Sequence, residues 1–226
     1  MPVLVTILAR KGSKSLPDKN IKDMAGKPLI QWTVDQAREW GGGRIVVSTD
    51  YPQSIVKGER VIRRPKRLAE DNTPKMDSIR HALFTAEAEM GCQFTEVVDL
   101  DVTNPLRTST DIDNCYKQFM ETKPDVLFSV TECRRNPYFN QVESVGGIIR
   151  LCKQPPPGAF RRQDVPYVYD LNASIYVYSR DFLADESHRV PTVGRCAIYE
   201  MPFFTGIDID TPEDWGYVEN ILRTRR

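Results

Sequence analysis

Short apolar runs alternate with segments of helical periodicity along the first 131 residues, and this alternation constrains the fold more than any other feature. Four runs predict buried strands, at 3–8, 44–49, 95–101 and 125–131. They are rich in apolar, often β-branched residues, as strands are when helices cover both faces of their sheet. Strand and helix in turn predict an α/β fold with a doubly wound, mostly parallel sheet.

The helical segments carry their own start signals. Pro28 stands where a first helical residue is expected, and an apolar stripe of period 3.6 follows it. A second stripe runs from Met76 to Met90. Two pairs match the capping-box pattern and predict further helices, Thr108 with Asp111 and Thr211 with Asp214.

The alternation of strand-like and helical segments is interrupted between residues 132 and 170. A strand-like run at 139–142 precedes Gly146-Gly147, and Pro155-Pro156-Pro157 cannot continue a sheet ladder. A strand is predicted again at 173–178. We therefore expect one domain over residues 1–226, with 132–170 an inserted lid or dimerisation lobe.

Composition excludes several classes of protein. The 226 residues carry 31 basic and 31 acidic side chains, so no overall field indicates a nucleic-acid or membrane partner. No segment approaches the roughly 18 apolar residues of a membrane span, and no signal peptide is evident. The five cysteines form no CxxC pair and the two histidines no metal-ligand spacing. We expect a cytoplasmic protein with reduced thiols, whose chemistry uses carboxylates, cations and a hard metal ion.

A cluster of positive charge follows the first predicted strand, in the stretch VTILARKGSKSLPDKNI. Arg10, Lys14 and Lys19 supply cationic side chains, and Gly12 supplies a backbone that can present N–H groups to an anion. Neither GxxxxGK[ST] nor GxGxxG is present. The residues alone leave two interpretations open, a polyphosphate-binding loop and an ordinary solvated loop.

Asp208 and Asp210 form a D-x-D pair shortly before the last predicted helix. On an extended segment both carboxylates point to the same side, and two hard oxygen ligands suit Mg²⁺ or Mn²⁺ bridging phosphate oxygens. The alternative is a solvated strand end. Asp101 is a possible third ligand, since Asp99 and Asp101 also share one face of a strand.

Short motifs follow one another in order along nearly the whole chain: Leu8-Ala9-Arg10, Ser13-Lys14, Leu16-Pro17, Lys19-Asn20, Gly26-Lys27-Pro28-Leu29, Ser48-Thr49-Asp50, Arg64-Pro65, His81-Ala82-Leu83, Asn104-Pro105-Leu106-Arg107, Ile175-Tyr176 and Ile207-Asp208-Ile209-Asp210-Thr211. Together these motifs resemble the acylneuraminate cytidylyltransferase (CMP-sialic acid synthetase) family. The resemblance implies a Rossmann-like nucleotidyltransferase domain, an enzyme of the nucleotide-diphospho-sugar transferase type. It also makes metal binding the better interpretation of Asp208 and Asp210.

The resemblance further implies roles for individual residues. Arg10, Lys14 and Lys19 would be catalytic, neutralising charge on the leaving pyrophosphate. The nucleotide would be bound by Leu8, Ala9, Arg10, Gly12, Ser13, Asn20 and Arg64. The sugar would be bound by Asp77, Asp101, Asn104, Arg161, Arg162, Gln163 and Asn172.

The chain departs from the family pattern around the expected sugar site. Asp101 stands where sialic-acid-activating members have a Gln, and a carboxylate there would repel an acidic sugar, favour an amino sugar or bind metal. Asp77 adds a second acidic group, although it is equally suited to the first turn of a helix. Ala173 replaces a glycine of the family motif next to Asn172.

Three functions follow, in order of preference. The first is transfer of CMP from CTP to a sialic-acid-like nonulosonic or related acidic sugar, with release of pyrophosphate. The second is a sugar-1-phosphate nucleotidyltransferase, for example GTP-dependent and acting on an amino-sugar 1-phosphate such as glucosamine 1-phosphate, which Asp101 and Asp77 favour. The third is a non-catalytic nucleotide-binding relative. The expected partners are a nucleoside triphosphate, a small sugar and a second copy of the chain in a homodimer, with neither nucleic acid nor membrane.

Overall fold

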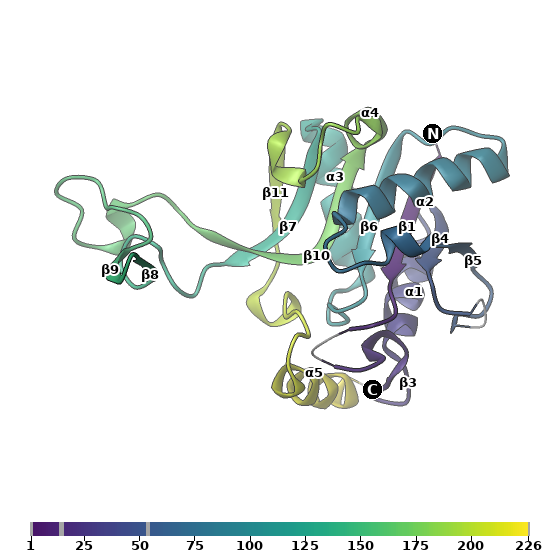
Figure 1. Ribbon diagram of the computed structural model, residues 1–226, viewed down its shortest axis with the longest axis horizontal. Coiled ribbons are helices and arrows are strands. Elements are labelled where there is room, and N and C mark those ends of the chain that lie inside the picture. The colour runs from purple at the N-terminus through teal and green to yellow at the C-terminus, as the bar shows by residue number, and fades with distance from the viewer. Residues whose placement is uncertain (1, 14–15, 53–54, 226) are drawn as a thin grey trace.

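The strand β1 (Val3–Ala9) lies inside a seven-stranded sheet, flanked by β4 (Arg44–Thr49) and β6 (Glu96–Asp101). The computed structural model describes residues 2–13, 16–52 and 55–225 (Figure 1). Most side chains of β1 are fully buried, which its apolar sequence requires. This strand carries the opening charged loop at its carboxyl end.

The sheet has the order β11-β7-β10-β6-β1-β4-β5. Its other strands are β5 (Arg60–Arg63), β7 (Val126–Glu132), β10 (Tyr169–Ser179) and β11 (Cys196–Glu200). Among the described strands of this sheet, β10 alone runs antiparallel to its neighbours. The predicted doubly wound, mostly parallel sheet is therefore confirmed. The two edge strands, β5 and β11, were not predicted.

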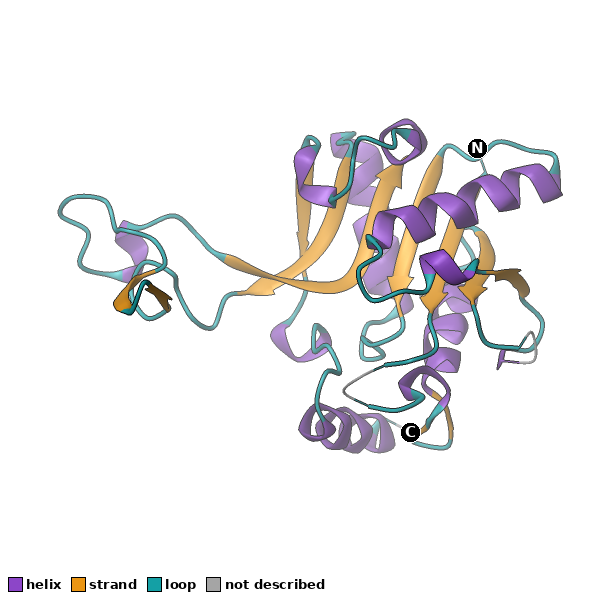
Figure 2. Ribbon diagram, in the orientation of Figure 1, coloured by secondary structure: helices purple, strands orange, loops and turns teal. Residues whose placement is uncertain are grey.

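Helices cover both faces of the sheet, as Figure 2 shows. On one face α1 (Leu29–Trp40) packs beside α3 (Ser109–Thr122), and on the other α2 (Lys75–Met90) packs beside α4 (Arg180–Ala184). The last helix is α5 (Pro212–Thr224). The predicted capping boxes are present at the starts of α3 and α5.

Shorter elements connect these layers and shape the surface above the sheet. They are η1 (Lys19–Ile21), β2 (Asp23–Met24), β3 (Lys27–Pro28), η3 (Lys66–Leu68), η5 (Pro191–Val193) and η6 (Phe203–Thr205). No described helix is both long and apolar enough to cross a membrane. All five cysteines are free thiols.

Between β7 and β10 the chain leaves the sheet as an arm, residues 133–168, which projects away from the body in Figure 1. It contains the hairpin of β8 (Val142–Val145) and β9 (Ile148–Leu151) and the short helix η4 (Arg162–Asp164). The strand predicted at 139–142 was wrong. Residues up to Asn140 form a turn, in which the backbone N–H groups of Phe139 and Asn140 donate to the Asn136 carbonyl at 3.1 and 2.9 Å. The strand begins only at Val142, and the lid or dimerisation role of the arm stays a prediction.

Candidate active site

A cleft of about 520 Å³ opens beyond the carboxyl ends of β1 and β6. The chain passes from β1 to β4 on one side of the sheet, while β6 pairs with β1 on the other side. The cleft therefore lies at the switch point of the sheet, where ligands bind in folds of this type. Its walls are formed by Leu8, Arg10, Ser13, Lys19, Asn20, Arg64, Leu68, Glu70, Asp71, Thr73, Lys75, Ser78, Asp101, Thr103 and Asp210.

The cations of the opening loop face this cleft and are held by carboxylates. The Arg10 guanidinium forms an ion pair with Asp71, from the loop before α2. The Lys19 side chain is almost buried; its ammonium donates to the Ile209 carbonyl and lies 3.6 Å from Asp210. Both contacts are ones that an incoming phosphate can replace, because phosphate oxygens accept from Arg and Lys as carboxylates do.

The rest of the opening loop divides between the cleft and its surroundings. Leu8, Ser13 and Asn20 line the cleft, and the Asn20 amide donates to the Arg10 carbonyl at 3.0 Å. Ala9 is buried beneath it, its carbonyl accepting a hydrogen bond from Thr49. Gly12 is exposed, with φ of 89° and open space around it. Lys14 lies outside the described residues.

Arg64 closes the cleft on the side of β4. Its guanidinium is buried and donates to the Ser48 carbonyl at 2.9 Å and the Ser48 hydroxyl at 3.3 Å. Burial lowers the pKa of Arg64 from 12.5 to about 10 against the opposing pull of Asp50, so the side chain stays cationic at neutral pH. These hydrogen bonds hold the Arg64 side chain in place as part of the cleft wall.

Asp210 lines the cleft next to Lys19, and Asp208 lies close enough to interact with Asp210, Lys19 and Asp101. The segment 207–210 is not a regular strand, and Ile209 between the two is fully buried. The Asp208 Oδ1 atom is buried without a hydrogen-bond partner among the described residues. Burial, aided by the nearby carboxylates of Asp101 and Asp210, raises the pKa of Asp208 from 3.8 to about 6. A buried carboxylate oxygen that lacks a donor and is crowded by other carboxylates fits a divalent cation.

The described residues contain no preformed group of three or more His, Cys, Asp or Glu side chains that could enclose a metal ion. Mg²⁺ does not require one, because it keeps several waters and is usually bound by one or two carboxylates together with substrate phosphates. The carboxylate oxygens of Asp208 and Asp210 thus fit a metal ion that binds together with a nucleotide.

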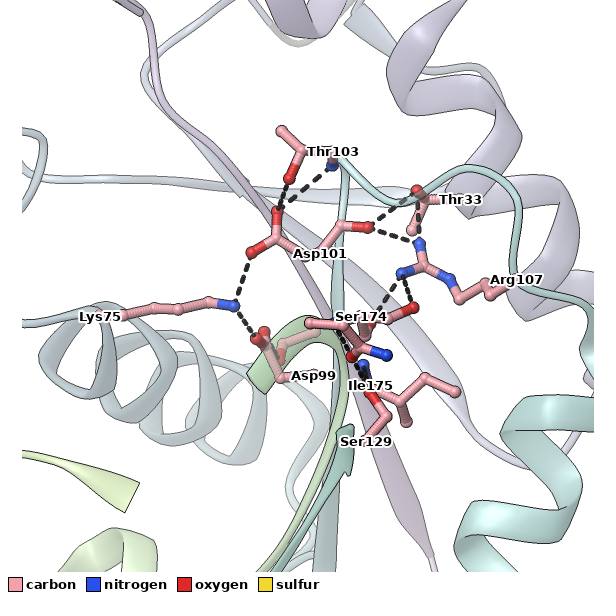
Figure 3. A network of polar contacts seen from close by, with 11 residues as sticks. Thr33, Lys75, Asp99, Asp101, Thr103, Arg107, Ser129, Ser174 and Ile175 are labelled. Carbon is pink, nitrogen blue, oxygen red and sulfur yellow. Dashed lines mark hydrogen bonds and ion pairs between the residues drawn. The ribbon is translucent and has the colours of Figure 1, made fainter. Parts of the chain in front are cut away.

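Lys75 connects the two carboxylates at the end of β6, as Figure 3 shows. Its Nζ atom lies 2.8 Å from Asp99 Oδ2 and 2.9 Å from Asp101 Oδ2. Lys75 is the first residue of α2 and also lines the cleft. It was missed from the sequence. The signal available there was the V-D-L-D pattern itself, since two carboxylates on one face of a buried strand require a cation.

The ion pairs of Lys75 with Asp99 and Asp101 change the interpretation of Asp101. Burial by itself would raise the pKa of Asp101, but Lys75, the backbone N–H of Thr103 and Arg107 outweigh it and lower the pKa from 3.8 to about 2. Burial likewise opposes the charge on Lys75, and Asp101 and Asp99 nevertheless hold its pKa well above 10.5. Asp101 is therefore ionised and compensated, rather than an unpaired negative charge facing the substrate.

Arg107 braces the same strand end from beneath the cleft (Figure 3). The side chain is 1% exposed and donates to the Ser174 carbonyl and the Thr33 hydroxyl, both at 2.7 Å, and to the Asp101 carbonyl. Burial lowers the pKa of Arg107 from 12.5 to about 10. Its neighbour Asn104 is fully buried away from the cleft, and neither of its side-chain polar atoms has a partner among the described residues.

Asn172 supports a bulge in β10 and does not line the cleft. Its Oδ1 atom accepts from the Ser129 hydroxyl at 2.7 Å and from the Ser174 N–H at 3.2 Å. Ala173 has φ of 56°, inside the interruption of the β10–β7 register between Leu171 and Tyr176. A left-handed backbone is easy for glycine and strained for alanine, which explains physically why a glycine suits this position.

Four further predicted sugar-binding residues also lie outside the cleft of their own chain. Asp77 points away from the cleft, 2.8 Å from Arg80 and 3.4 Å from Arg189, and lines a separate cavity of about 340 Å³. Arg161, Arg162 and Gln163 lie on the arm, where Arg161 is paired with Asp164 at 2.9 Å. The structure thus gathers Arg10, Lys19, Asp101 and Asp210 at the cleft, whereas these four residues, Asn104 and Asn172 lie outside it.

Comparison with known proteins shows to which family the chain belongs. Residues 4–220 match the family model described as cytidylyltransferase. The chain belongs to the cytidylyltransferase family. It is therefore an enzyme of the nucleotidyltransferase class, as the motifs predicted.

Individual relatives are similar over nearly the whole of this chain. The chain is 35% identical to the post-translational flagellin modification protein B of Campylobacter coli, covering 99% of this chain and 96% of that protein. It is 34% identical to the CMP-N,N'-diacetyllegionaminic acid synthase of Campylobacter jejuni, covering 97% and 94%. An N-acylneuraminate cytidylyltransferase of Streptococcus agalactiae is 31% identical over 96% of this chain and 52% of its own length.

A solved structure shows the same fold. The CMP:2-keto-3-deoxy-manno-octonic acid synthetase, in complex with CTP, superposes with a TM-score of 0.74 over the full length of both chains at 19% identity. The sheet and its helices are therefore those of a known nucleotidyltransferase.

Proposed function

We propose that this cytidylyltransferase transfers CMP from CTP to a sialic-acid-like nonulosonic or related acidic sugar and releases pyrophosphate. Relatives at 34% and 31% identity are named for such reactions, a CMP-N,N'-diacetyllegionaminic acid synthase and an N-acylneuraminate cytidylyltransferase. The single observation that carries the proposal is the cleft itself. It combines the loop cations Arg10 and Lys19 with the carboxylate pair that ends in Asp210.

The charge balance of the cleft explains why a metal ion would be needed. Its described walls carry four cationic and four anionic side chains, so the empty cleft offers no net attraction for a triphosphate. Mg²⁺, or Mn²⁺, held by Asp208 and Asp210 would supply positive charge to the phosphate oxygens and compensate both carboxylates. Asp101 is already compensated by Lys75, which leaves it a poor third ligand.

In the proposed reaction the anomeric hydroxyl oxygen of the sugar forms a bond to the α-phosphorus of CTP. The bond from that phosphorus to the bridging oxygen breaks, pyrophosphate leaves, and the hydroxyl proton is released. Arg10, Lys14 and Lys19 stabilise the charge that develops on the leaving group, while Arg64 and the backbone at Leu8 and Ala9 hold the base.

The alternative of a GTP-dependent sugar-1-phosphate nucleotidyltransferase loses its main support. Asp101 and Asp77 favoured it as uncompensated negative groups near an amino sugar. Asp101 is paired with Lys75, and Asp77 with Arg80 in another cavity. No remaining observation favours this activity over transfer of CMP.

The direct test is an activity matrix. Pyrophosphate release would be followed with each of the four nucleoside triphosphates, against N-acetylneuraminic acid, N,N'-diacetyllegionaminic acid and a set of sugar 1-phosphates, with and without Mg²⁺. We expect release only with CTP, an acidic sugar and the metal ion. Release restricted to GTP and a sugar 1-phosphate would overturn the proposal, as would no release with any pair.

We also propose that the enzyme is a cytoplasmic homodimer joined through its arm. The arm exposes apolar side chains that a monomer would leave in water, with Ile148, Ile149, Phe160 and Tyr167 between 65% and 90% exposed. If the arm reaches across to a second copy, Arg161, Arg162 and Gln163 can meet the acidic sugar in the partner's cleft. Residues 132–170 would then serve both as a dimerisation lobe and as a lid over the partner's cleft.

Two measurements test the dimer. Sedimentation velocity should show a dimer for the wild type and a monomer for Ile148→Asp/Ile149→Asp. Mixing Asp210→Asn subunits with Arg161→Ala/Arg162→Ala subunits should restore activity that neither variant has alone, because one cleft in each mixed dimer is intact. A monomeric wild type, or no recovery on mixing, would contradict the arrangement.

A further inference from the structure

We propose that Lys75 and Asp101 together form a specificity-determining pair that binds a neutral hydroxyl group of the acceptor sugar. The inference rests on the proposed transfer of CMP to a sugar and deepens it. It is carried by the geometry at the end of β6, where a lysine from a helix and an aspartate from a strand present a hydrogen-bond donor and an acceptor side by side in the cleft.

The Lys75 ammonium keeps hydrogen-bond donors for a ligand. One of its three N–H groups donates to Asp101 Oδ2 at 2.9 Å, whereas Asp99 Oδ2, 2.8 Å from Nζ, forms an ion pair without a hydrogen bond. No further hydrogen-bond acceptor for Lys75 lies among the described residues, and the ammonium lies over the Tyr176 ring at 5.0 Å from its centroid. Lys75 can therefore donate to a ligand without giving up either carboxylate.

Asp101 keeps acceptor capacity in the same way. Its Oδ1 atom takes the Thr103 N–H at 3.3 Å and the Thr103 hydroxyl at 3.1 Å, while Oδ2 takes Lys75. Each carboxylate oxygen can accept two hydrogen bonds, so Oδ2 has room for one more donor. A donor and an acceptor 2.9 Å apart match a hydroxyl, which accepts from Lys75 and donates to Asp101.

Asp99 acts as a positioning residue for this pair. It is fully buried, and its Oδ1 atom accepts from the Thr6 hydroxyl at 2.7 Å. With the opposite oxygen it fixes the end of the Lys75 side chain, which has four rotatable bonds and would otherwise be mobile. Such fixing lowers the entropy lost when a ligand binds.

Charge and hydrogen-bonding capacity decide between a hydroxyl and other ligand groups. A carboxylate of the acceptor would meet two aspartates for one lysine. An ammonium has no acceptor for the Lys75 donor, so it would lie against that charge without a hydrogen bond to it. A neutral hydroxyl avoids both penalties. The acidic end of the sugar is then free to bind Arg161 and Arg162 of the arm. Lys75 and Asp101 bind a hydroxyl group of its neutral part.

The pair also lies in the part of the cleft where the acceptor has to be. Thr103, which holds Asp101, accepts the Ile209 N–H at 3.0 Å, and Ile209 stands between Asp208 and Asp210. The acceptor must meet the α-phosphate beside that carboxylate pair. Lys75 and Asp101 would thus lie beside an acceptor that meets the α-phosphate there.

The test crosses enzyme variants with acceptor analogues. Values of kcat/KM would be measured for N,N'-diacetyllegionaminic acid, or N-acetylneuraminic acid if only that sugar is used, and for its single-deoxy analogues. The enzymes would be the wild type, Lys75→Met, Asp101→Asn and, as matched control, Lys117→Met, which removes an exposed lysine paired with Asp113 on α3. In Asp101→Asn the amide oxygen stays with the Thr103 donors, so the NH₂ group faces the ligand and the acceptor atom is lost.

We expect one deoxy analogue to lower the wild-type kcat/KM about 10- to 100-fold, the range for a hydrogen bond to a charged group. The same analogue should cost Asp101→Asn and Lys75→Met less than about threefold, since the interaction is already gone. Lys117→Met should behave as the wild type. Equal discrimination against every analogue by wild type and variants would overturn the inference.

Failure of the inference is separable from failure of the proposed function. A wild type that releases no pyrophosphate from CTP with any acidic sugar contradicts the proposed function before any variant is made. If Lys75→Met does not fold, judged by near-ultraviolet circular dichroism, Asp101→Asn decides alone, because it retains the ion pair between Lys75 and Asp99.

Discussion

The two sides of the cleft are built differently. On the side of the opening loop, most charged groups are solvated: the side chain of Asp210 is 74% exposed and Arg10 is held by an exposed aspartate, and only Lys19 is almost buried. On the side of β6, Asp99 is fully buried and Arg107 nearly so, and each has several partners fixed by the sheet. The first side can rearrange around a flexible triphosphate; the second is rigid before any ligand arrives.

This difference predicts how substitutions will behave. A change on the loop side should reduce activity with little loss of stability, because solvated groups contribute little to folding. A change beneath the β6 side should reduce stability as well, because it leaves buried polar groups without partners. The predictions below run from the largest expected effect to the smallest.

Asp210→Asn should lower kcat/KM for CTP by about 10³-fold, roughly 4 kcal/mol, because it weakens the proposed metal site and its charge. The free energy of unfolding should stay within about 0.5 kcal/mol of wild type, since the side chain is exposed. Steady-state kinetics over a range of Mg²⁺ concentrations, with urea denaturation, measure both. The matched control is Asp113→Asn on α3, which should change neither; normal turnover by Asp210→Asn would remove that residue from the site.

Arg107→Met should lower the free energy of unfolding by about 3 kcal/mol, since it removes the guanidinium donor from the buried Ser174 carbonyl and leaves the Asp101 carbonyl with the Thr33 hydroxyl alone. The exposed Arg195→Met is the control, with an expected change below about 0.5 kcal/mol. Urea denaturation compares the two. If Arg107→Met were as stable as Arg195→Met, the β6 side would not be the rigid element described above.

The Asp101 carboxylate should make stability depend on pH in a defined direction. A carboxyl group whose pKa is lowered by folding, here from 3.8 to about 2, stabilises the fold above its unfolded pKa. That contribution is lost as the pH falls through the folded value. Wild type should exceed Asp101→Asn by about 2 kcal/mol at pH 6 and by roughly half as much at pH 3. A gap in unfolding free energy that did not change between these pH values would show that the charge of Asp101 is not what stabilises the strand end.

Ala173→Gly should raise the free energy of unfolding by about 0.5 kcal/mol. Relief of the left-handed strain at φ 56° is worth about 1–2 kcal/mol, and the greater freedom of glycine in the unfolded chain offsets part of it. Ala88→Gly, at an exposed position inside α2, should instead destabilise by about 1 kcal/mol. Thermal or urea denaturation of the pair checks the sign, and destabilisation of both variants would mean that the bulge does not strain Ala173.

The sequence predicted most of what depends on local pattern. Buried strands, helical stripes and capping boxes are each encoded within a few residues, so the inner strands of the sheet, the helices α1, α2, α3 and α5 and the loop cations Arg10 and Lys19 were predicted, while β5, β11 and α4 were not. The edge strand β5 was missed because it has an arginine at each end. The arm strand was misplaced because the turn at Asn136 depends on hydrogen bonds that apolar pattern does not reveal.

What escaped prediction depends on residues that are distant in the chain. Lys75 lies more than twenty positions before Asp99 and looks like an ordinary lysine at the start of a helix. Only the packing of α2 over the sheet brings it to the end of β6. Asp77 is two residues later on the same helix and therefore points away from the cleft. It pairs with Arg80 and Arg189 instead of lying where the sugar was expected.

The division of the cleft is tested most directly by calorimetric titration of CTP, with Mg²⁺, into Lys19→Met and Asp101→Asn. Lys19 belongs to the phosphate side and Asp101 to the acceptor side. The account predicts that Lys19→Met loses about tenfold or more in CTP affinity, as expected for one charge-assisted contact, while Asp101→Asn binds CTP within about twofold of wild type. An Asp101→Asn variant that loses as much CTP affinity as Lys19→Met would contradict it.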